Sequence, residues 1–343
     1  MKKKLAALFL AALMMAGTLA GCGGTGNDGG APAADNGGSS ADAGSADSGT
    51  SGGYRMGYSM PARDQFQTSM QMAIEAKAKA EGIEMSVLDA NGDVATQLSH
   101  VQTWAADGYD AVIIGLCNND SAADVLAAAG DMKVVFVNRQ PSLDVLKDGE
   151  VVYVGTDETL YGTEQGNYLA DIFQEEGKTD INVVLFMGEL GLDNVTKRTN
   201  SAKEALAANG LNVNYVYEAT ANWDRITAMN LFSQFMGSGE TVDAVVCNND
   251  EMALGVIEAM KTTGSNEVIC PVVGIDATDV GCAAVQSGDM ACSVFQDPVA
   301  QGEGTITCAL GLLNGSEIEG LVDNYYNITP QLVTQENVAD FMK

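Results

Sequence analysis

The chain has 343 residues, and its 17 Lys and Arg against 46 Asp and Glu give a formal net charge of −29 at pH 7. So large an acidic excess argues against binding nucleic acid or an anionic membrane by charge attraction. The single histidine, His100, is expected to be an ordinary helix residue. Its isolation excludes most zinc sites and the Ser-His and Cys-His nucleophile pairs, so we expect no metal and no cofactor.

The first element is a basic start followed by an apolar run, residues 1–21. This run is too short for a normal membrane span and predicts a secretory signal peptide. The "LAGC" at its end resembles the lipobox of bacterial lipoproteins, in which the peptide is cut before the cysteine and the cysteine carries lipid. The resemblance implies a lipid anchor on Cys22; the alternative is an ordinary signal peptide with an incidental cysteine.

Residues 22–53 are almost entirely Gly, Ala, Ser, Asp and Asn. Such a chain cannot bury enough apolar surface to offset its ordering entropy, so a flexible tether is predicted here. Without residues 1–21 the chain keeps 14 basic and 46 acidic residues, a net charge of −32. The remaining stretch of about 290 residues is long enough for two domains.

From residue 54 onward, strand-like and helix-like runs alternate. Strands are predicted at 54–60, 84–90, 110–116, 133–138, 151–157, 181–188, 212–220, 243–250, 271–276 and 291–297. Helices are predicted at 63–82, 94–106, 120–130, 160–176, 194–209, 224–237, 250–262, 278–287 and 298–314. The strands are near-continuous Val/Ile runs, as in parallel sheets covered by helices on both faces. The pattern therefore predicts an α/β fold with two similar doubly wound parallel-sheet lobes.

Six cysteines follow the tether, mostly inside apolar runs and without a C-x-x-C pair. Export would allow disulfides, but buried free thiols acting as small hydrophobic side chains fit these positions better.

Polar residues gather where the predicted strands end, which is where ligands bind on such sheets. Each could instead be a turn residue or a helix N-cap, and Asp250 and Asp279 are expected to be caps. The set as a whole combines Asp, Asn, Gln and Arg with two aromatic rings, Phe66 and Trp223. Planar groups that donate and accept in pairs suit hydroxyls, and flat rings suit the C–H faces of a sugar. The carboxylates of Asp64 and Asp276 would repel an anion, so a neutral sugar is favoured.

From Arg55 to about residue 330 the chain resembles the type I periplasmic sugar-binding proteins of ABC transporters, in the glucose/galactose-binding and ribose-binding group. The stretches that carry the resemblance are "VVFVNRQPS", "YVGTD", "GELGLDNVTKR", "ATANWD", "CNNDEMALGVIEAMK", "VVGIDAT" and "SGDMACSVFQD". It implies two lobes joined by a three-segment hinge near 157–159, 296–298 and 325–330. The N-terminal lobe would comprise 54–157 plus 298–325, and the C-terminal lobe 158–297 plus 326–343.

The resemblance also implies ligand-binding roles for particular residues. Asp64 and Arg198 would bind sugar oxygens, while Phe66 and Trp223 would stack on opposite faces of the ring. The full set of expected ligand-binding residues is Asp64, Phe66, Asn138, Arg139, Asn194, Arg198, Trp223, Asn249, Asp276 and Gln296.

Two positions depart from the pattern of the family. Leu192 replaces a histidine that contacts the exocyclic hydroxyl in relatives, and Asn194 replaces an aspartate that contacts the anomeric hydroxyl. A pentose, a 6-deoxyhexose or a differently seated hexose therefore stay open as ligands. The calcium loop of the family is reduced to "KTD" at 178–180, so no metal site is expected.

The resemblance implies a binding protein and not an enzyme. We expect a monomeric extracytoplasmic lipoprotein, anchored to the outer face of the cell membrane, that delivers a glucose/galactose-like pyranose to a separate permease chain. The alternatives are a sugar sensor that signals to a membrane chemoreceptor or kinase, a sugar-responsive repressor, and an enzyme using Asp64 and Asp276 as acid and base.

Overall fold

The computed structural model describes residues 53–262 and 266–342, which belong to one compact unit. The expected signal peptide, Cys22 and all but the last residue of the expected tether lie outside the described residues. Within the described ranges, no helix is both long and apolar enough to cross a membrane.

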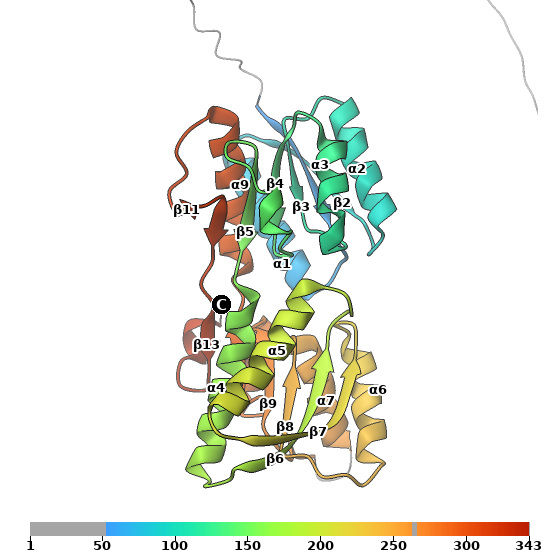
Figure 1. Cartoon of the computed structure of the whole chain (residues 1–343), viewed down its shortest axis with the longest axis vertical. Helices are drawn as coiled ribbons and strands as arrows, with labels where there is room; N and C mark the ends of the chain where they lie inside the picture. The colour runs from blue at the N-terminus through green and yellow to red at the C-terminus, as the bar shows by residue number, and fades with distance from the viewer. Residues whose placement is uncertain (1–52, 263–265, 343) are drawn as a thin grey trace, which may run out of the picture. The chain divides into compact units, whose positions relative to one another are not determined.

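The first lobe is built on a seven-stranded sheet (Figure 1). Its strands, in spatial order, are β11 (Leu321–Val322), β12 (Tyr325–Asn327), β5 (Val151–Gly155), β4 (Lys133–Val137), β3 (Ala111–Ile114), β1 (Arg55–Met60) and β2 (Glu84–Asp89). All neighbours pair in parallel except β11 and β12. Helices α1 (Gln65–Ala80) and α9 (Pro298–Asn314) cover one face, and α2 (Val94–Ala106) and α3 (Ala122–Ala129) cover the other.

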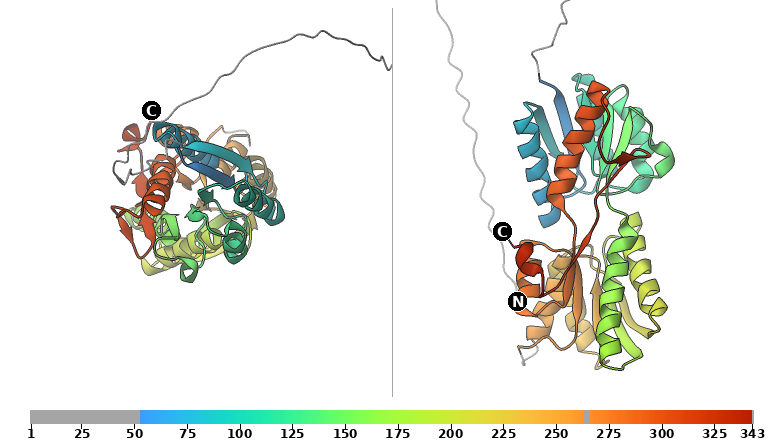
Figure 2. Two further views of the ribbon diagram at one scale, coloured as in Figure 1. Left: turned by 90° about the horizontal axis from the view of Figure 1, so that it is seen from above. Right: turned by 90° about the vertical axis from the view of Figure 1, so that its left-hand side faces the viewer.

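The second lobe is built on a six-stranded sheet. Its strands, in spatial order, are β13 (Gln331–Val333), β10 (Cys292–Phe295), β9 (Val272–Asp276), β8 (Ala244–Cys247), β6 (Asp180–Met187) and β7 (Asn212–Thr220). Only β13 pairs antiparallel, with β10. Helices α4 (Glu158–Glu175) and α5 (Asp193–Ala208) lie side by side on one face (Figures 1 and 2). The other face carries α6 (Arg225–Met236), α7 (Asp250–Thr262) and α8 (Asp279–Ser287).

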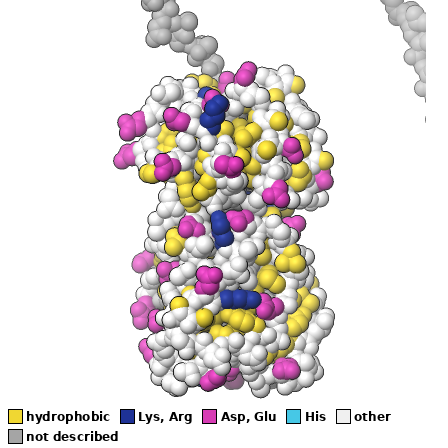
Figure 3. Space-filling view, in the orientation of Figure 1, with side chains coloured by type: hydrophobic (Ala, Val, Ile, Leu, Met, Phe, Trp, Pro, Cys, Tyr) yellow, Lys and Arg dark blue, Asp and Glu magenta, His cyan; other side chains and the backbone are white. Residues whose placement is uncertain are grey.

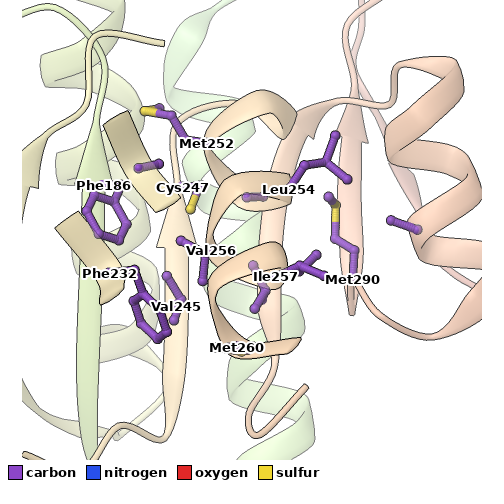
Figure 4. Packing of buried hydrophobic residues seen from close by; sticks show 14 of the residues in the cluster. Phe186, Phe232, Val245, Cys247, Met252, Leu254, Val256, Ile257, Met260 and Met290 are labelled. Atoms are coloured by element: carbon purple, nitrogen blue, oxygen red, sulfur yellow. The ribbon is translucent and has the colours of Figure 1, made fainter. Parts of the chain in front are cut away.

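Alternation along each strand explains why both faces of each sheet are covered. Val135 and Val137 of β4 pack toward α1 and α9, whereas Val134 and Phe136 pack toward α2 and α3. In the second lobe, Figure 4 shows Val245 of β8 beside Val256 of α7. Each such aliphatic side chain contributes about 1.5–3 kcal/mol when fully buried. The strands read as continuous apolar runs because neither face meets water.

Aspartates and asparagines begin several helices and thereby set where each strand-end loop stops. Asp64 caps α1 and Asp224 caps α6, each accepting from a backbone N–H in the first turn. The expectation that Asp250 and Asp279 are caps is wrong. Asn249 Oδ1 accepts from the Met252 N–H at the start of α7. Thr278 caps α8, while Asp250 points inward to Thr278 and Ser293.

Within the described residues, the chain passes between the two sheets three times, after β5, after β10 and after β12. The predicted α/β fold with two similar, mostly parallel lobes is confirmed. The third passage leaves the first sheet after β12, which ends at Asn327 and pairs with β5. The expected lobe boundaries stay predictions.

The six cysteines of the described residues are buried and unpaired. Burial raises the pKa of the Cys308 thiol to about 12 and that of Cys270 to about 12, so both are held as neutral thiols. In the part of the chain that the structure describes, no group of three or more His, Cys, Asp or Glu side chains could hold a metal ion.

Candidate ligand-binding site

The ten side chains expected to bind ligand come together around one cavity between the lobes, and Gln67 joins them. The loops after strands and the first two turns of helices supply them, at the edge of the parallel sheets where ligands are expected. The N-terminal lobe contributes Asp64, Phe66 and Gln67 from the start of α1, and Asn138 and Arg139 from the loop after β4. The C-terminal lobe contributes Asn194 and Arg198 of α5, Trp223, Asn249, Asp276 and Gln296.

The wall from the first lobe is fixed by hydrogen bonds to the backbone. Asp64 Oδ1 accepts from the Gln67 N–H at 2.7 Å. Arg139 Nη1 donates to the carbonyls of Leu116 and Cys117, at 3.0 and 3.3 Å, where the chain leaves β3. The positions of these polar groups are therefore set by the lobe itself.

Arg198 is the most restrained side chain of the second wall. Its Nε donates to Glu158 Oε2 at 2.6 Å, its Nη1 to the Asn248 carbonyl at 3.0 Å and its Nη2 to Gln296 Oε1 at 3.2 Å. Its guanidinium carbon lies 4.8 Å from the ring centre of Tyr161 and 5.8 Å from that of Trp223. A planar cation held in this way presents fixed donors to a ligand, because little rotamer entropy is left to lose.

Three of the site residues have left-handed backbones: Asn138 with φ 64°, Trp223 with φ 65° and Asp276 with φ 113°. Such values are uncommon outside glycine and are strained for a bulky residue such as tryptophan. Each of these residues follows or ends a strand, so the strain turns its side chain at the sheet edge. Backbone strain of this kind concentrates at functional sites.

Gln296 connects the two walls. Its Oε1 accepts from Asn138 Nδ2 at 2.9 Å and from Arg198 Nη2, and its Nε2 donates to Asp276 Oδ1 at 2.9 Å. The space between the side chains is about 30 Å³, roughly two water molecules. Of these bonds, the one between Asn138 and Gln296 crosses from one lobe to the other. A ring-sized ligand could fit only if this bond were displaced and its polar groups were paired again.

Burial controls the charge of the two cleft carboxyls. Desolvation raises the pKa of Asp64, which the Gln67 amide opposes. Desolvation and the nearby Asp250 raise the pKa of Asp276 well above its usual range, which Arg198 opposes. Both shifts favour the protonated form, in which a carboxyl donates as well as accepts hydrogen bonds.

A second cavity, of about 680 Å³, lies beside the first and also takes residues from both lobes. At its edge Lys197 Nζ donates to Gln140 Oε1 at 2.7 Å. Helix α5 has no side-chain cap of its own at Leu192; instead the Asp193 N–H donates to Asn119 Oδ1 of the other lobe at 3.3 Å. The first turn of α5 is thus capped from the opposite lobe.

Three polar residues of this region were not anticipated. Gln67 Nε2 donates to Asn138 Oδ1 at 3.0 Å, and Gln301 Oε1 accepts from Asn138 Nδ2 at 3.3 Å. Glu158 lies behind Arg198. Gln67 and Gln301 lie inside predicted helices, so the strand-end criterion passed over them. Glu158 directly follows the strand predicted at 151–157 and was assigned only to the hinge near 157–159. The only available signal was a polar residue on the apolar face of a predicted helix, as at Gln301 in "VAQGEGTITCAL".

Two α/β lobes, three connecting segments and a polar cleft with two aromatic rings define a bilobed ligand-binding protein. The chain belongs to the periplasmic binding protein family, since residues 56–317 match the profile described as "Periplasmic binding protein domain". The resemblance to periplasmic sugar-binding proteins is thereby confirmed. The family places the chain outside the cytoplasm, among binding components of ABC transporters.

Three relatives illustrate the similarity. A putative rhizopine-binding protein of Rhizobium meliloti is 36% identical over 283 residues, covering 81% of this chain and 89% of the relative. The D-galactose/methyl-galactoside binding periplasmic protein of Haemophilus influenzae is 29% identical, over 82% of this chain and 89% of the relative. An ABC transporter solute binding protein of Bacillus halodurans, solved with myo-inositol bound, has a TM-score of 0.76 at 31% identity, over 85% of this chain and 98% of that one.

Proposed function

We propose that this chain binds one neutral six-membered polyol ring between its lobes and delivers it to the permease of an ABC importer. One observation carries the proposal. The cavity that Phe66 and Trp223 line is also lined by Asp, Asn, Gln and Arg side chains, whose planar groups form hydrogen bonds in pairs. Rings with C–H faces suit the aromatic planes, and rim hydroxyls suit Asp, Asn, Gln and Arg. A hydroxyl left unpaired in such a buried site costs about 1–3 kcal/mol, which selects stereochemistry.

Position 192 bears on the ring class. Leu192 is buried, with 3% of its surface exposed, and it lines the neighbouring cavity and not the cleft cavity, so position 192 provides no hydrogen bond to an exocyclic hydroxyl in the cleft. A ring without an exocyclic hydroxymethyl group suits this position, and a cyclitol is such a ring. Among the relatives named above, one was solved with myo-inositol. A glucose/galactose-like pyranose is the second candidate, favoured by the galactose-binding relative.

The same geometry supports binding and not catalysis. Asp64 and Asp276 are each engaged in positioning, Asp64 as the cap of α1 and Asp276 as the acceptor for Gln296. The two carboxyls therefore serve as hydroxyl acceptors in our proposal. Hinge movement of the three connecting segments would open and close the cleft. We further propose that the protein is a monomer and that lipid on Cys22 holds it at the outer face of the membrane. A single attached lipid chain binds a membrane weakly, whereas two or more attached lipid chains bind it stably.

A thermal-shift panel tests the proposal. It compares myo-inositol, D-galactose, D-glucose, D-ribose and D-galacturonate at equal concentration. A bound ligand at a hundred times its dissociation constant adds about 2.7 kcal/mol of apparent stability. We expect the largest shift with a neutral six-membered ring and none with the anion. A panel in which galacturonate shifts the melting temperature most would contradict the assignment of a neutral ligand.

Replacing Trp223 by alanine is expected to weaken binding of the best panel member about ten- to hundred-fold, as for a stacked tryptophan at the centre of a contact. The loss arises because the ring contributes one apolar wall of the cavity. The protein should still fold. Isothermal calorimetry measures the effect, and Ile226→Ala is the matched control, since Ile226 is 63% exposed nearby on α6. Equal ligand affinity in Trp223→Ala and Ile226→Ala would show that Trp223 does not contact the ligand.

A further inference from the structure

Gly188 lies directly after β6, and its backbone contacts the indole of Trp223. A Cβ at this position would overlap Cζ2, Cε2 and Cη2 of the indole. These atoms are consecutive in the six-membered ring and would be at nearly equal distances, as when an atom stands over the face of a ring and not at its edge. One face of the indole therefore lies on the Gly188 backbone, and only the opposite face is left for a ligand.

The Gly188 backbone is held firmly. Its N–H donates to Asn248 Oδ1 at 3.2 Å, and its carbonyl accepts from Thr220 Oγ1. Its φ is outside the left-handed range, so the backbone itself would accept alanine. The absence of a side chain at 188 is required by the indole alone, and alanine could be accommodated only if the indole moved.

The indole has little freedom to adjust in other directions. The backbone of Trp223 is left-handed, with φ 65°, and its carbonyl accepts from Asn249 Nδ2 at 3.4 Å. The Arg198 guanidinium lies 5.8 Å from the ring centre. Carbon atoms in contact need about 3.5–4.0 Å, so a methyl group at 188 would displace the ring on the order of 1 Å.

We infer that Gly188 is a positioning residue for ligand recognition: it sets the plane of Trp223 and thereby the gap available to a ring stacked on it. The inference rests on the proposed function. A methyl group at 188 moves the stacking face away from its place relative to Phe66 and Arg198. It alters affinity through Trp223 and through nothing else.

The test is a double-mutant cycle with Gly188→Ala, Trp223→Ala and the double variant, titrated by calorimetry with myo-inositol and D-galactose. We expect Gly188→Ala to weaken binding at least about ten-fold, as overpacking at a fixed wall does. In the Trp223→Ala background the same change should have no further effect. The control is Gly237→Ala, where an added Cβ would approach no atom closer than 3.3 Å.

Wild-type affinity in Gly188→Ala would overturn the inference, as would an equal loss in the Trp223→Ala background. A wild-type protein that binds neither compound would count against the proposed function alone. A crystal structure of Gly188→Ala then decides the positioning role without ligand. A displaced indole supports the role, and an indole unmoved relative to Arg198 overturns it.

Discussion

Replacing Glu158 by alanine is expected to destabilise the protein by about 3–5 kcal/mol, because it leaves the Arg198 guanidinium buried without its counter-ion. The pair is fully enclosed, with side-chain exposures of 3% for Arg198 and 1% for Glu158. Burial raises the pKa of Glu158, and the neighbouring Arg198 guanidinium opposes that rise. Ligand affinity should fall as well, because Glu158 orients a side chain that lines the cleft. Urea unfolding followed by circular dichroism measures the loss.

The matched control is Glu251→Ala. Glu251 pairs with Arg225 at 2.8 Å, but the two side chains are 22% and 26% exposed. A pair that reaches solvent contributes only about 0–1 kcal/mol. If Glu158→Ala were no more destabilising than Glu251→Ala, the Arg198 charge would not depend on Glu158, and our description of the second wall would be wrong.

The unfolding free energy should decrease as the pH rises from 4 to 7, and Asp250 should be a main cause. Asp250 is completely buried behind the cleft, where desolvation raises its pKa to about 7 despite hydrogen bonds from Ser293 and Thr278. Its folded pKa lies above its unfolded value, so the folded state binds more protons in this window. Stability then falls by up to about 1.4 kcal/mol per pH unit, or roughly 4 kcal/mol in all, until the group is ionised in both states.

Asp250→Asn cannot ionise and should lack this part of the pH dependence, which urea unfolding at pH 4, 5, 6, 7 and 8 would measure. Asp276, Asp64 and Glu158 also have raised pKa values, so a residual slope of the same sign should remain in Asp250→Asn.

Asp243→Asn is the control. At Asp243 desolvation is outweighed by the Asn182 amide and Lys178, and its pKa is lowered. The stabilisation that the Asp243 carboxylate contributes is lost only as the pH falls through that lowered pKa. Above pH 5, the unfolding free energy of Asp243→Asn should therefore change with pH as it does in the wild type. Parallel slopes in the wild type and Asp250→Asn would contradict the prediction.

The fold was predictable because its strongest signals are local. Val/Ile runs such as 133–137 and 244–247 can be buried on both faces only in a covered parallel sheet. The short strands β11, β12 and β13 have two or three residues and no periodic pattern. Their pairing is decided by neighbouring strands already in place, and no window of the sequence contains that information.

The site was predictable to the extent that strand ends define it. Asn138 and Asp276 follow or end strands, and chain direction alone brings such residues to one edge. Glu158 and Gln67 instead lie on helices. Glu158 pairs with Arg198 and Gln67 with Asn138, each within its own lobe, so their roles depend on packing. Asp250 was expected to cap a helix, yet its carboxyl faces inward to Ser293, which is 43 residues distant in sequence.

Charge was predictable as a total and not as a local arrangement. Figure 3 shows acidic side chains scattered over the surface of both lobes, with basic side chains in few places. The guanidinium groups of Arg139 and Arg198 are buried instead, with 7% and 3% of each residue exposed. The acidic surface therefore surrounds a cleft that is lined by two buried arginines and two aspartates. The net charge of −29 does not predict this local arrangement.

The central claim is that one neutral ring binds between Phe66 and Trp223. A crystal structure of the protein grown with the panel member that gives the largest thermal shift tests it most directly. We predict electron density for a single ring against both aromatic side chains, with Gln296 released from Asn138 and Arg198. Density in the neighbouring cavity beside Lys197, or a cleft in which Gln296 keeps both bonds while ligand is bound elsewhere, would contradict the account.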